Sequence, residues 1–250
     1  GYIMKNPNLL FPFVQKQINN PPHWGDERLL SWDDAFPQEC QQFVTQHYWT
    51  AEASVNVFNV VGTEHWDYQG KTWLEFLQGG RCMPLNLQCL ETNPNYYLSL
   101  TQRNPQIYYK TVDGVRFYVG SDGNHRTCLA RFLLAEQAKA HIHCVTVDHY
   151  KVDWAFYNVY QQLKAIIVEN RLPYTLDVSN TLNGREDTAG WKIDNFHVAI
   201  TLTDLETYES CSLDLSQALE KKEALQRIST VQQLQRQQAS KTLWRRILNR

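Results

Sequence analysis

Polar and charged side chains are concentrated at one junction, where a strand is expected to end and a helix to begin. The run Phe117-Tyr118-Val119 breaks at Gly120, and residues 121–127 read Ser-Asp-Gly-Asn-His-Arg-Thr. The first turn of a helix presents backbone N–H groups without intrahelical partners, and the helix dipole favours an anion there. The sequence therefore predicts an anion-binding helix start at residues 120–127.

The residues of this helix start have the chemistry that a phosphate needs. Gly123 allows the backbone to come close to a ligand. Asn124 and His125 offer donors, and the planar guanidinium of Arg126 can bind a phosphate through two parallel hydrogen bonds. Thr127 could cap the helix or contact the phosphate. Phosphate binding, with His125 and Arg126 in the reacting centre, is the interpretation that we favour.

The same side chains also have structural interpretations. Asp122 could bind Mg²⁺ or orient His125, but aspartate is also a preferred helix cap and turn residue. Arg126 could pair with a structural acid. His125 could equally be a structural hydrogen-bond donor.

The composition is that of a folded globular chain without a global bias toward polyanions. The 250 residues are 43% hydrophobic and 12% aromatic, and the formal net charge is −2. The six cysteines form no C-x-x-C pair, and no signal peptide or apolar run of about 20 residues is seen. We therefore expect a cytoplasmic protein with free thiols and no membrane span.

Residues 50–150 are expected to alternate between strands and helices. The expected elements are strands over 54–61, 83–90 and 143–147, helices over 72–77 and 124–139, and a hairpin of 106–109 with 115–119 around Asp113-Gly114. Thr72 would cap the first helix, and Gly79-Gly80 would stop it. This order predicts an α+β domain with a small mixed sheet.

The flanking segments divide the rest of the chain. The predicted organisation is an irregular N-terminal wrap over 1–50 with a short helix at 38–46, the domain over 51–150, an α/β extension over 151–215, and a basic amphipathic helix over 216–250. Within the extension we expect a helix at 155–169, a polar, turn-rich stretch at 172–195 and a strand at 196–202.

The run Asp122-Gly123-Asn124-His125-Arg126, in a strand–turn–helix context, resembles the signature of the ParB/sulfiredoxin superfamily. ParB proteins have a Gly-Glu-Arg-Arg version, sulfiredoxin has Gly-Cys-His-Arg, and many ParB-like nuclease and kinase domains have Asp-Gly-x-His-Arg. The resemblance covers residues 50–150. It implies a ParB/sulfiredoxin-like fold that binds ATP or another nucleotide, usually with Mg²⁺.

The resemblance also implies activities: cleavage of a phosphate bond by an ATPase, a small-molecule kinase or a DNase. The nucleotide phosphates would lie on Gly123 to Thr127, with Mg²⁺ at Asp122. Where sulfiredoxin has its cysteine and ParB its glutamate, this chain has Asn124, so a catalytic carboxylate must come from elsewhere. Glu64 is the candidate, because related enzymes place functional residues in the loop after the first strand.

Two other classes of function remain open. Plasmid-encoded fertility inhibitors such as Osa and FiwA have a compact ParB-like domain, and this chain could likewise be a non-catalytic interaction protein. Residues 217–250 hold eight basic residues against two acidic ones, a local net of +6, so this helix could also bind DNA or an acidic protein. The alternative for the helix is packing on the body with a solvated basic face. The sequence does not determine the oligomeric state.

Overall fold

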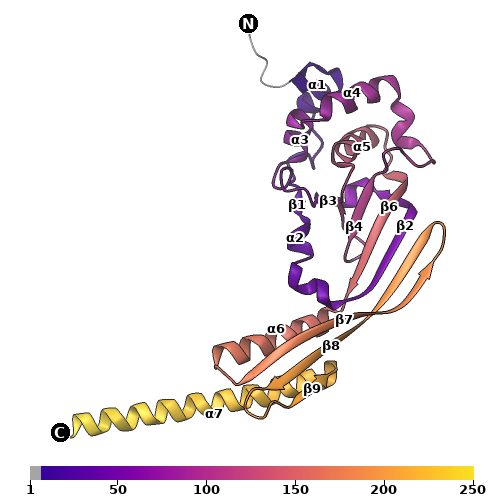
Figure 1. Cartoon of the computed structure of the whole chain (residues 1–250). Helices are drawn as coiled ribbons and strands as arrows, with labels where there is room; N and C mark the ends of the chain where they lie inside the picture. Colours follow the sequence, from indigo (N-terminus) through magenta and orange to yellow (C-terminus); the bar gives the residue numbers. More distant parts are fainter. Residues whose placement is uncertain (1–6) are drawn as a thin grey trace. The chain divides into compact units, whose positions relative to one another are not determined.

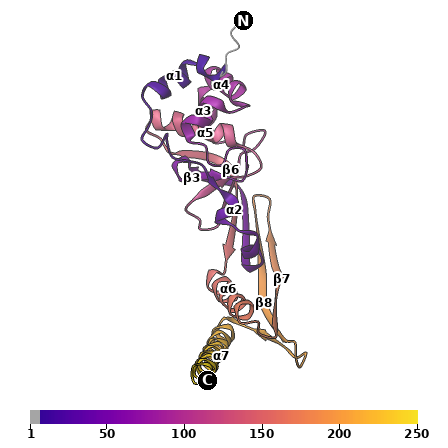
Figure 2. The same ribbon diagram turned by 90° about the vertical axis from the view of Figure 1, so that its left-hand side faces the viewer.

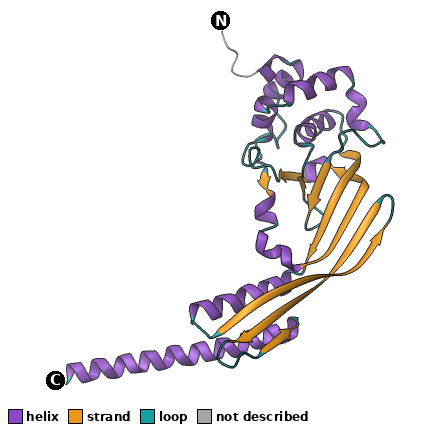
Figure 3. Ribbon diagram, viewed as in Figure 1, coloured by secondary structure: helices purple, strands orange, loops and turns teal. Residues whose placement is uncertain are grey.

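The computed structural model describes residues 7–250 and combines helices with a mixed β-sheet (Figure 3), which confirms the α+β class. By their internal contacts, the residues divide into two units. The first unit contains the residues up to 38 together with 46–151 and 184–195. The second contains 39–45, 152–183 and 196–250.

The first unit is built from a sheet and a group of helices, with the candidate site among them. Its strands are β1 (Leu30–Ser31), β3 (Val60–Thr63), β5 (Phe117–Val119), β4 (Tyr108–Thr111), β6 (His141–Val152) and most of β2 (Val44–Asn56), in that order across the sheet. β3 pairs in parallel with both β1 and β5, β4 is antiparallel to β5, and β6 is parallel to β4. Residues 46–50, in the first half of β2, pair in antiparallel fashion with residues 191–195.

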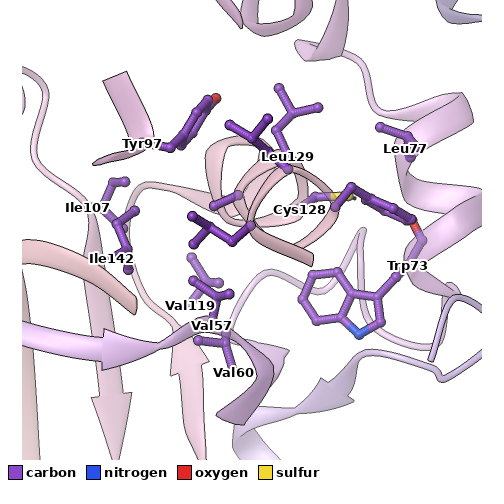
Figure 4. Packing of buried hydrophobic residues seen from close by; sticks show 14 of the residues in the cluster. Val57, Val60, Trp73, Leu77, Tyr97, Ile107, Val119, Cys128, Leu129 and Ile142 are labelled. Atoms are coloured by element: carbon purple, nitrogen blue, oxygen red, sulfur yellow. Dashed lines mark hydrogen bonds between the residues drawn. The ribbon is translucent and has the colours of Figure 1, made fainter. Parts of the chain in front are cut away.

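The helical segments of this unit are η1 (Pro7–Leu10), α1 (Pro12–Asn19), α2 (Trp32–Ala35), η3 (Val57–Asn59), α3 (Trp73–Gly79), α4 (Met83–Thr92), η4 (Pro94–Leu98) and α5 (Asn124–Glu136). Of these, α1, α3, α4 and α5 lie close together in both views of the chain, and α2 lies apart from them (Figures 1 and 2). Helix α5 contacts α3, α4 and η3. Its side chains Cys128, Leu129 and Phe132 are fully buried in the core, and Figure 4 shows the first two.

A buried arginine links distant parts of this core. Arg131 of α5 is 2% exposed, and its Nη1 donates to the carbonyls of Val57 (3.0 Å) and Val60 (2.7 Å). Its guanidinium carbon lies 4.4 Å from the ring centroid of Trp24 and 4.2 Å from that of Trp73. Burial lowers the pKa of Arg131 to about 10. The side chain is therefore charged at neutral pH, and the two indole faces stabilise this charge.

The second unit has its own apolar core. It contains α6 (Trp154–Glu169), α7 (Leu215–Leu248), β9 (Ser210–Leu213) and most of β7 (Tyr174–Asp187) and β8 (Trp191–Asp204). Phe43, Phe156, Leu163, Ile200 and Leu225 are among its buried residues. Asp153 caps α6 by accepting from the Phe156 N–H at 3.1 Å, and Asp214 forms a capping box with Gln217 at the start of α7.

Several expected elements are present. Thr72 caps α3 in a full capping box with Glu75, and the Asp113-Gly114 turn lies between β4 and β5. The expected helices at 124–139, 155–169 and 216–250 correspond to α5, α6 and α7, and the strand at 143–147 lies within β6. The expected strand at 196–202 is the middle of β8.

Other elements were predicted wrongly. The expected strand at 83–90 is helix α4, because Met83, Leu87 and Leu90 are buried at helical spacing and Pro84 suits a first turn. Residues 83–90 therefore do not form the upstream strand that the resemblance to the superfamily included. The expected helix at 38–46 is a 3₁₀ segment, η2 (Gln38–Phe43), followed by β2. The expected strand at 54–61 is divided among β2, η3 and β3.

The polar stretch at 172–195 was also predicted wrongly, since it forms β7 and the beginning of β8. Its residues alternate between half-buried and exposed from Tyr174 to Asn180, the pattern of a strand with one covered face. The two compact units also divide the chain differently from the four expected segments. In particular, the described part of the expected N-terminal wrap contributes Val14, Trp24 and Leu29 to the core of the first unit.

Candidate functional site

A cavity of about 500 Å³ lies at the start of α5, within the first unit. Three segments line it: the turn into α5, one face of α4, and η4 with the loop that follows. The lining residues are Asp122, Gly123, Asn124, His125 and Arg126; Cys82, Asn86, Cys89, Thr92 and Asn93; and Tyr96, Tyr97, Asn104 and Pro105. The lining is rich in side-chain amides and contains one carboxylate.

Gly123 sets the backbone of the helix start. Its φ is +116°, and a Cβ at this position would lie 2.8 Å from Cγ2 of Ile107, so both the dihedral angle and the space require glycine. Gly123 is the N-cap residue and supplies no side-chain cap to α5. Within residues 7–250, the backbone N–H groups of residues 124–126 have no hydrogen-bond acceptor. Three donors at a helix start thus adjoin the cavity.

Arg126 is engaged by the protein itself. Its Nη1 donates to the Tyr96 hydroxyl at 3.0 Å and to the Pro105 carbonyl, and its Nη2 donates to the Gln106 carbonyl at 3.1 Å and to Oδ1 of Asp122 at 3.0 Å. Burial disfavours the charge, but Tyr96 and Asp122 together raise the pKa of Arg126 above its usual value. The guanidinium therefore ties the 105–106 loop to α5 and builds one wall of the cavity.

His125 fixes the beginning of α4 as a neutral ring. Its Nε2 accepts a hydrogen bond from the Cys82 N–H at 3.2 Å, which places the ring proton on Nδ1. The ring packs on Tyr68 and Phe76 at centroid distances of 5.3 and 5.0 Å. Burial, and secondarily the nearby His65, lower the pKa of His125 to about 4. At neutral pH the side chain therefore contributes no positive charge to the cavity.

Asn124 lies in the cavity lining, whereas Thr127 does not. Asn124 is 8% exposed, and its Oδ1 accepts from the Thr63 hydroxyl at 2.6 Å, which orients its amide NH₂. Thr127 is completely buried, and its hydroxyl shares a 2.7 Å hydrogen bond with that of Tyr109. Its position behind the first turn makes it part of the core.

The structure does not place Glu64 in this cavity. The Glu64 carboxylate forms an ion pair with Nζ of Lys110 at 2.7 Å, and its backbone N–H donates to the Val119 carbonyl at 2.9 Å. Of the candidate residues, those from 122 to 126 come together in the lining, and Glu64 and Thr127 lie outside it.

The sequence reasoning missed the opposite wall of the cavity. Asn86, Cys89 and Asn93 are spaced by three and four residues, and this face of α4 differs from the buried one. The same periodicity that identifies the helix would have placed them on one side of it. The contribution of Tyr96 depends on the path of the loop after α4, for which the sequence has no local signal.

Metal ligands are sparse in the described chain. Among residues 7–250, no group of three or more His, Cys, Asp or Glu side chains could hold a metal ion. Asp122 is the carboxylate of the cavity lining, and its Oδ1 already accepts from Arg126. Mg²⁺ commonly uses one or two carboxylates together with substrate phosphates, so Asp122 fits a metal that arrives with its ligand better than a resident ion.

Comparisons of this chain with protein-family models, with curated proteins and with solved structures found no match. Across the helices of residues 7–250, none is both long and apolar enough to cross a membrane.

Proposed function

We propose that this protein binds a nucleotide in the cavity at the start of α5. The observation that carries the proposal is the set of three unpartnered N–H groups of residues 124–126, which adjoin a cavity of about 500 Å³. Small-ligand sites have volumes of roughly 300–1,000 Å³, so the cavity suits a ligand of nucleotide size.

In this proposal, the phosphates occupy the helix start and the base occupies the wall formed by α4 and η4. The free N–H groups and the amide of Asn124 would donate to phosphate oxygens. The ring of Tyr96 offers a surface for stacking, since every nucleobase has a π-face. Asn86 and Asn93 would supply donors and acceptors to the edge of the base.

We further propose a ParB/sulfiredoxin-like arrangement for the region around this site. Residues 122 and 123 lie between strand β5 and helix α5, and residues 124–126 form the first turn of α5, which is the setting that the resemblance implies. Helix α3, with its Thr72 cap, precedes them. The helical conformation of residues 83–92 departs from the expected element order, so the motif and its setting support this proposal more than the upstream elements do.

Mg²⁺-dependent cleavage of a phosphate bond, as in an ATPase, a kinase or a DNase, is a separate proposal. It would use Asp122 as the metal contact, because this carboxylate lies in the lining. The ion pair of Glu64 with Lys110 favours a second candidate function, namely nucleotide binding without cleavage in an interaction or inhibitor protein. Glu64 could act only after a rearrangement that separates it from Lys110.

A thermal-shift experiment with ATP, CTP, GTP and UTP, each with and without Mg²⁺, tests the binding proposal. A nucleotide that binds only the folded protein raises its Tm. Asn93→Glu should reduce the shift, because it removes the amide that would pair with the edge of the base and adds a negative charge to a cavity that would hold an anionic ligand. Asn95→Glu is the matched control: Asn95 is also exposed and close in sequence, but it does not line this cavity.

The outcomes separate the proposals. If none of the four nucleotides raises the Tm, or if the two variants respond alike, the binding proposal is wrong. If a nucleotide binds, release of inorganic phosphate measures cleavage. Release that is lost in Asp122→Asn but kept in Glu64→Gln supports cleavage with Asp122 as the metal contact, whereas binding without release supports the second candidate.

A further inference from the structure

Helix α7 extends far beyond the helix on which it packs. It has 34 residues and α6 has 16, so at 1.5 Å per residue their lengths are about 51 and 24 Å. Only the first half of α7 is covered: Ala218, Leu225 and Ser229 are buried, and the Ser229 hydroxyl donates to Asn170 at 2.6 Å. From residue 233 onward every side chain of α7 is exposed, and Figure 1 shows this half continuing past α6.

The uncovered half is strongly basic and has exposed apolar side chains near its end. Residues 233–250 contain five basic residues and no acidic one, a local net charge of +5. Leu243, Trp244, Ile247 and Leu248 are 59%, 61%, 54% and 77% exposed. Four large apolar side chains within two turns, without a covering element in the described chain, indicate an interaction surface.

From residue 241 to the end of α7, the apolar and basic side chains lie on separate faces. At about 100° per residue, the four apolar residues of 243–248 occupy an arc of about 140°. Lys241, Arg245 and Arg246 lie on the remaining circumference, and Lys241 borders one edge of the apolar arc. Arg236, two turns earlier, projects on the side of the arc, and Arg250 follows the end of α7. The long side chain of Lys241 can reach outward while the neighbouring apolar side chains are buried.

A second copy of this chain does not fit this surface. Continuing the helical spacing from Leu225 and Ile228 leads to Gln232, Gln235 and Ala239, so no apolar heptad seam reaches the exposed half. Two such helices would also repel each other through their positive charges. Nucleic acid would neutralise the basic side chains but would leave the apolar ones in water, namely Leu243, Trp244, Ile247 and Leu248.

We propose that the segment 233–250, which is the exposed half of α7 and the two residues after it, binds the surface of an anionic lipid bilayer. The apolar arc, with Trp244, would enter the boundary between headgroups and acyl chains, and the basic residues would lie at the anionic headgroups. The bilayer matches both faces at once, because it has an apolar interior beneath a negatively charged surface. This inference is independent of the nucleotide proposal.

Co-sedimentation of the full chain with vesicles tests the proposal. We expect binding to mixed phosphatidylcholine–phosphatidylglycerol vesicles, no binding to pure phosphatidylcholine vesicles, and weaker binding as the salt concentration rises. Replacing both Arg245 and Arg246 by Gln should reduce the partition coefficient roughly 30-fold, at about one kcal/mol per basic residue. Arg227→Gln is the control, since Arg227 is a basic residue of α7 outside the segment.

The apolar arc is tested with variants of matched exposure. Ile247→Ser should weaken vesicle binding several-fold. Leu234→Ser should leave binding unchanged, because Leu234 is equally exposed (57% against 54%) but lies outside the arc. Far-UV circular dichroism would verify that both variants keep their helix.

Three results would overturn the proposal. One is equal binding to anionic and uncharged vesicles. Another is equal loss in Ile247→Ser and Leu234→Ser. The third is that the chain fails to bind anionic vesicles but binds a DNA duplex in a salt-dependent way, with the same affinity in the Ile247→Ser variant. This result would assign the segment to nucleic acid instead.

Discussion

Replacing Arg126 by Met should destabilise the first unit strongly, although arginine is the residue of the motif most readily assigned to phosphate. Met keeps an apolar stem of similar length and removes the guanidinium. The Pro105 and Gln106 carbonyls and the Tyr96 hydroxyl would then lose their donor, and Asp122 would lose its ion pair. A buried acceptor left without its donor costs about 1–3 kcal/mol, whereas Asp122 is 47% exposed and can be rehydrated, so we expect a loss of about 2–4 kcal/mol from the carbonyls and the hydroxyl.

Arg116→Met is the matched control. Arg116 also pairs with an aspartate on its own segment, Asp113, at 3.2 Å, but its side chain is 60% exposed. Exposed pairs of this kind contribute roughly 0.2–1 kcal/mol. Urea denaturation followed by far-UV circular dichroism would measure both changes in the free energy of unfolding. A loss below about 1 kcal/mol in Arg126→Met, equal to that of Arg116→Met, would refute the structural role and leave the guanidinium available for a ligand.

Three further predictions concern single residues near the site. Gly123→Ala should lower the free energy of unfolding by about 2–4 kcal/mol, because the new side chain would be held at a positive φ and its Cβ would lie 2.8 Å from Ile107. Gly79→Ala should be neutral or slightly stabilising, and similar values for the two variants would contradict this account. Because burial lowers the pKa of His125 to about 4 from 6.5, the unfolded chain binds more protons between these pH values. Stability should therefore be full above pH 6.5 and fall as the pH drops toward 4, and a His125→Gln variant with an undiminished slope would argue against it. Thr72→Ala should cost about 1 kcal/mol by removing the cap of α3, measured in the same urea assay, and no measurable loss would show that the capping box is unimportant.

The parts of the fold that follow local chemistry could be predicted from the sequence. The Thr72 cap, the Asp113-Gly114 turn and the start of α5 at Asn124 each depend on residues within a few positions of one another. Residues 83–90 could be misread because Leu85 and Leu87 alternate as in a strand, while the helical set Met83, Leu87 and Leu90 is the one that is buried. The difference is decided by packing against the rest of the core.

The candidate site divides in the same way. Residues 122–126 could be assigned to one site because a single turn places them together. The engagement of Arg126 by the Pro105 and Gln106 carbonyls and of Glu64 by Lys110 depends on contacts between segments far apart in the sequence. Such contacts have no local signature, so the sequence could indicate which side chains are polar but not which of them remain available to a ligand.

The stacked arrangement around Arg131 determines where this protein can be cut for experiments. A fragment that begins near residue 51, as the motif alone would suggest, lacks Trp24 and exposes one face of a guanidinium that is 2% exposed in the whole chain. The fragment would keep the Val57 and Val60 carbonyls and the Trp73 ring, so the guanidinium of Arg131 would stay in place. It would then lie beside the apolar surface that Trp24 covers in the whole chain. Expression of the motif region by itself should thus yield an aggregating product, and a fragment intended for ligand studies has to retain Trp24 and also Val14, which lies in the same core.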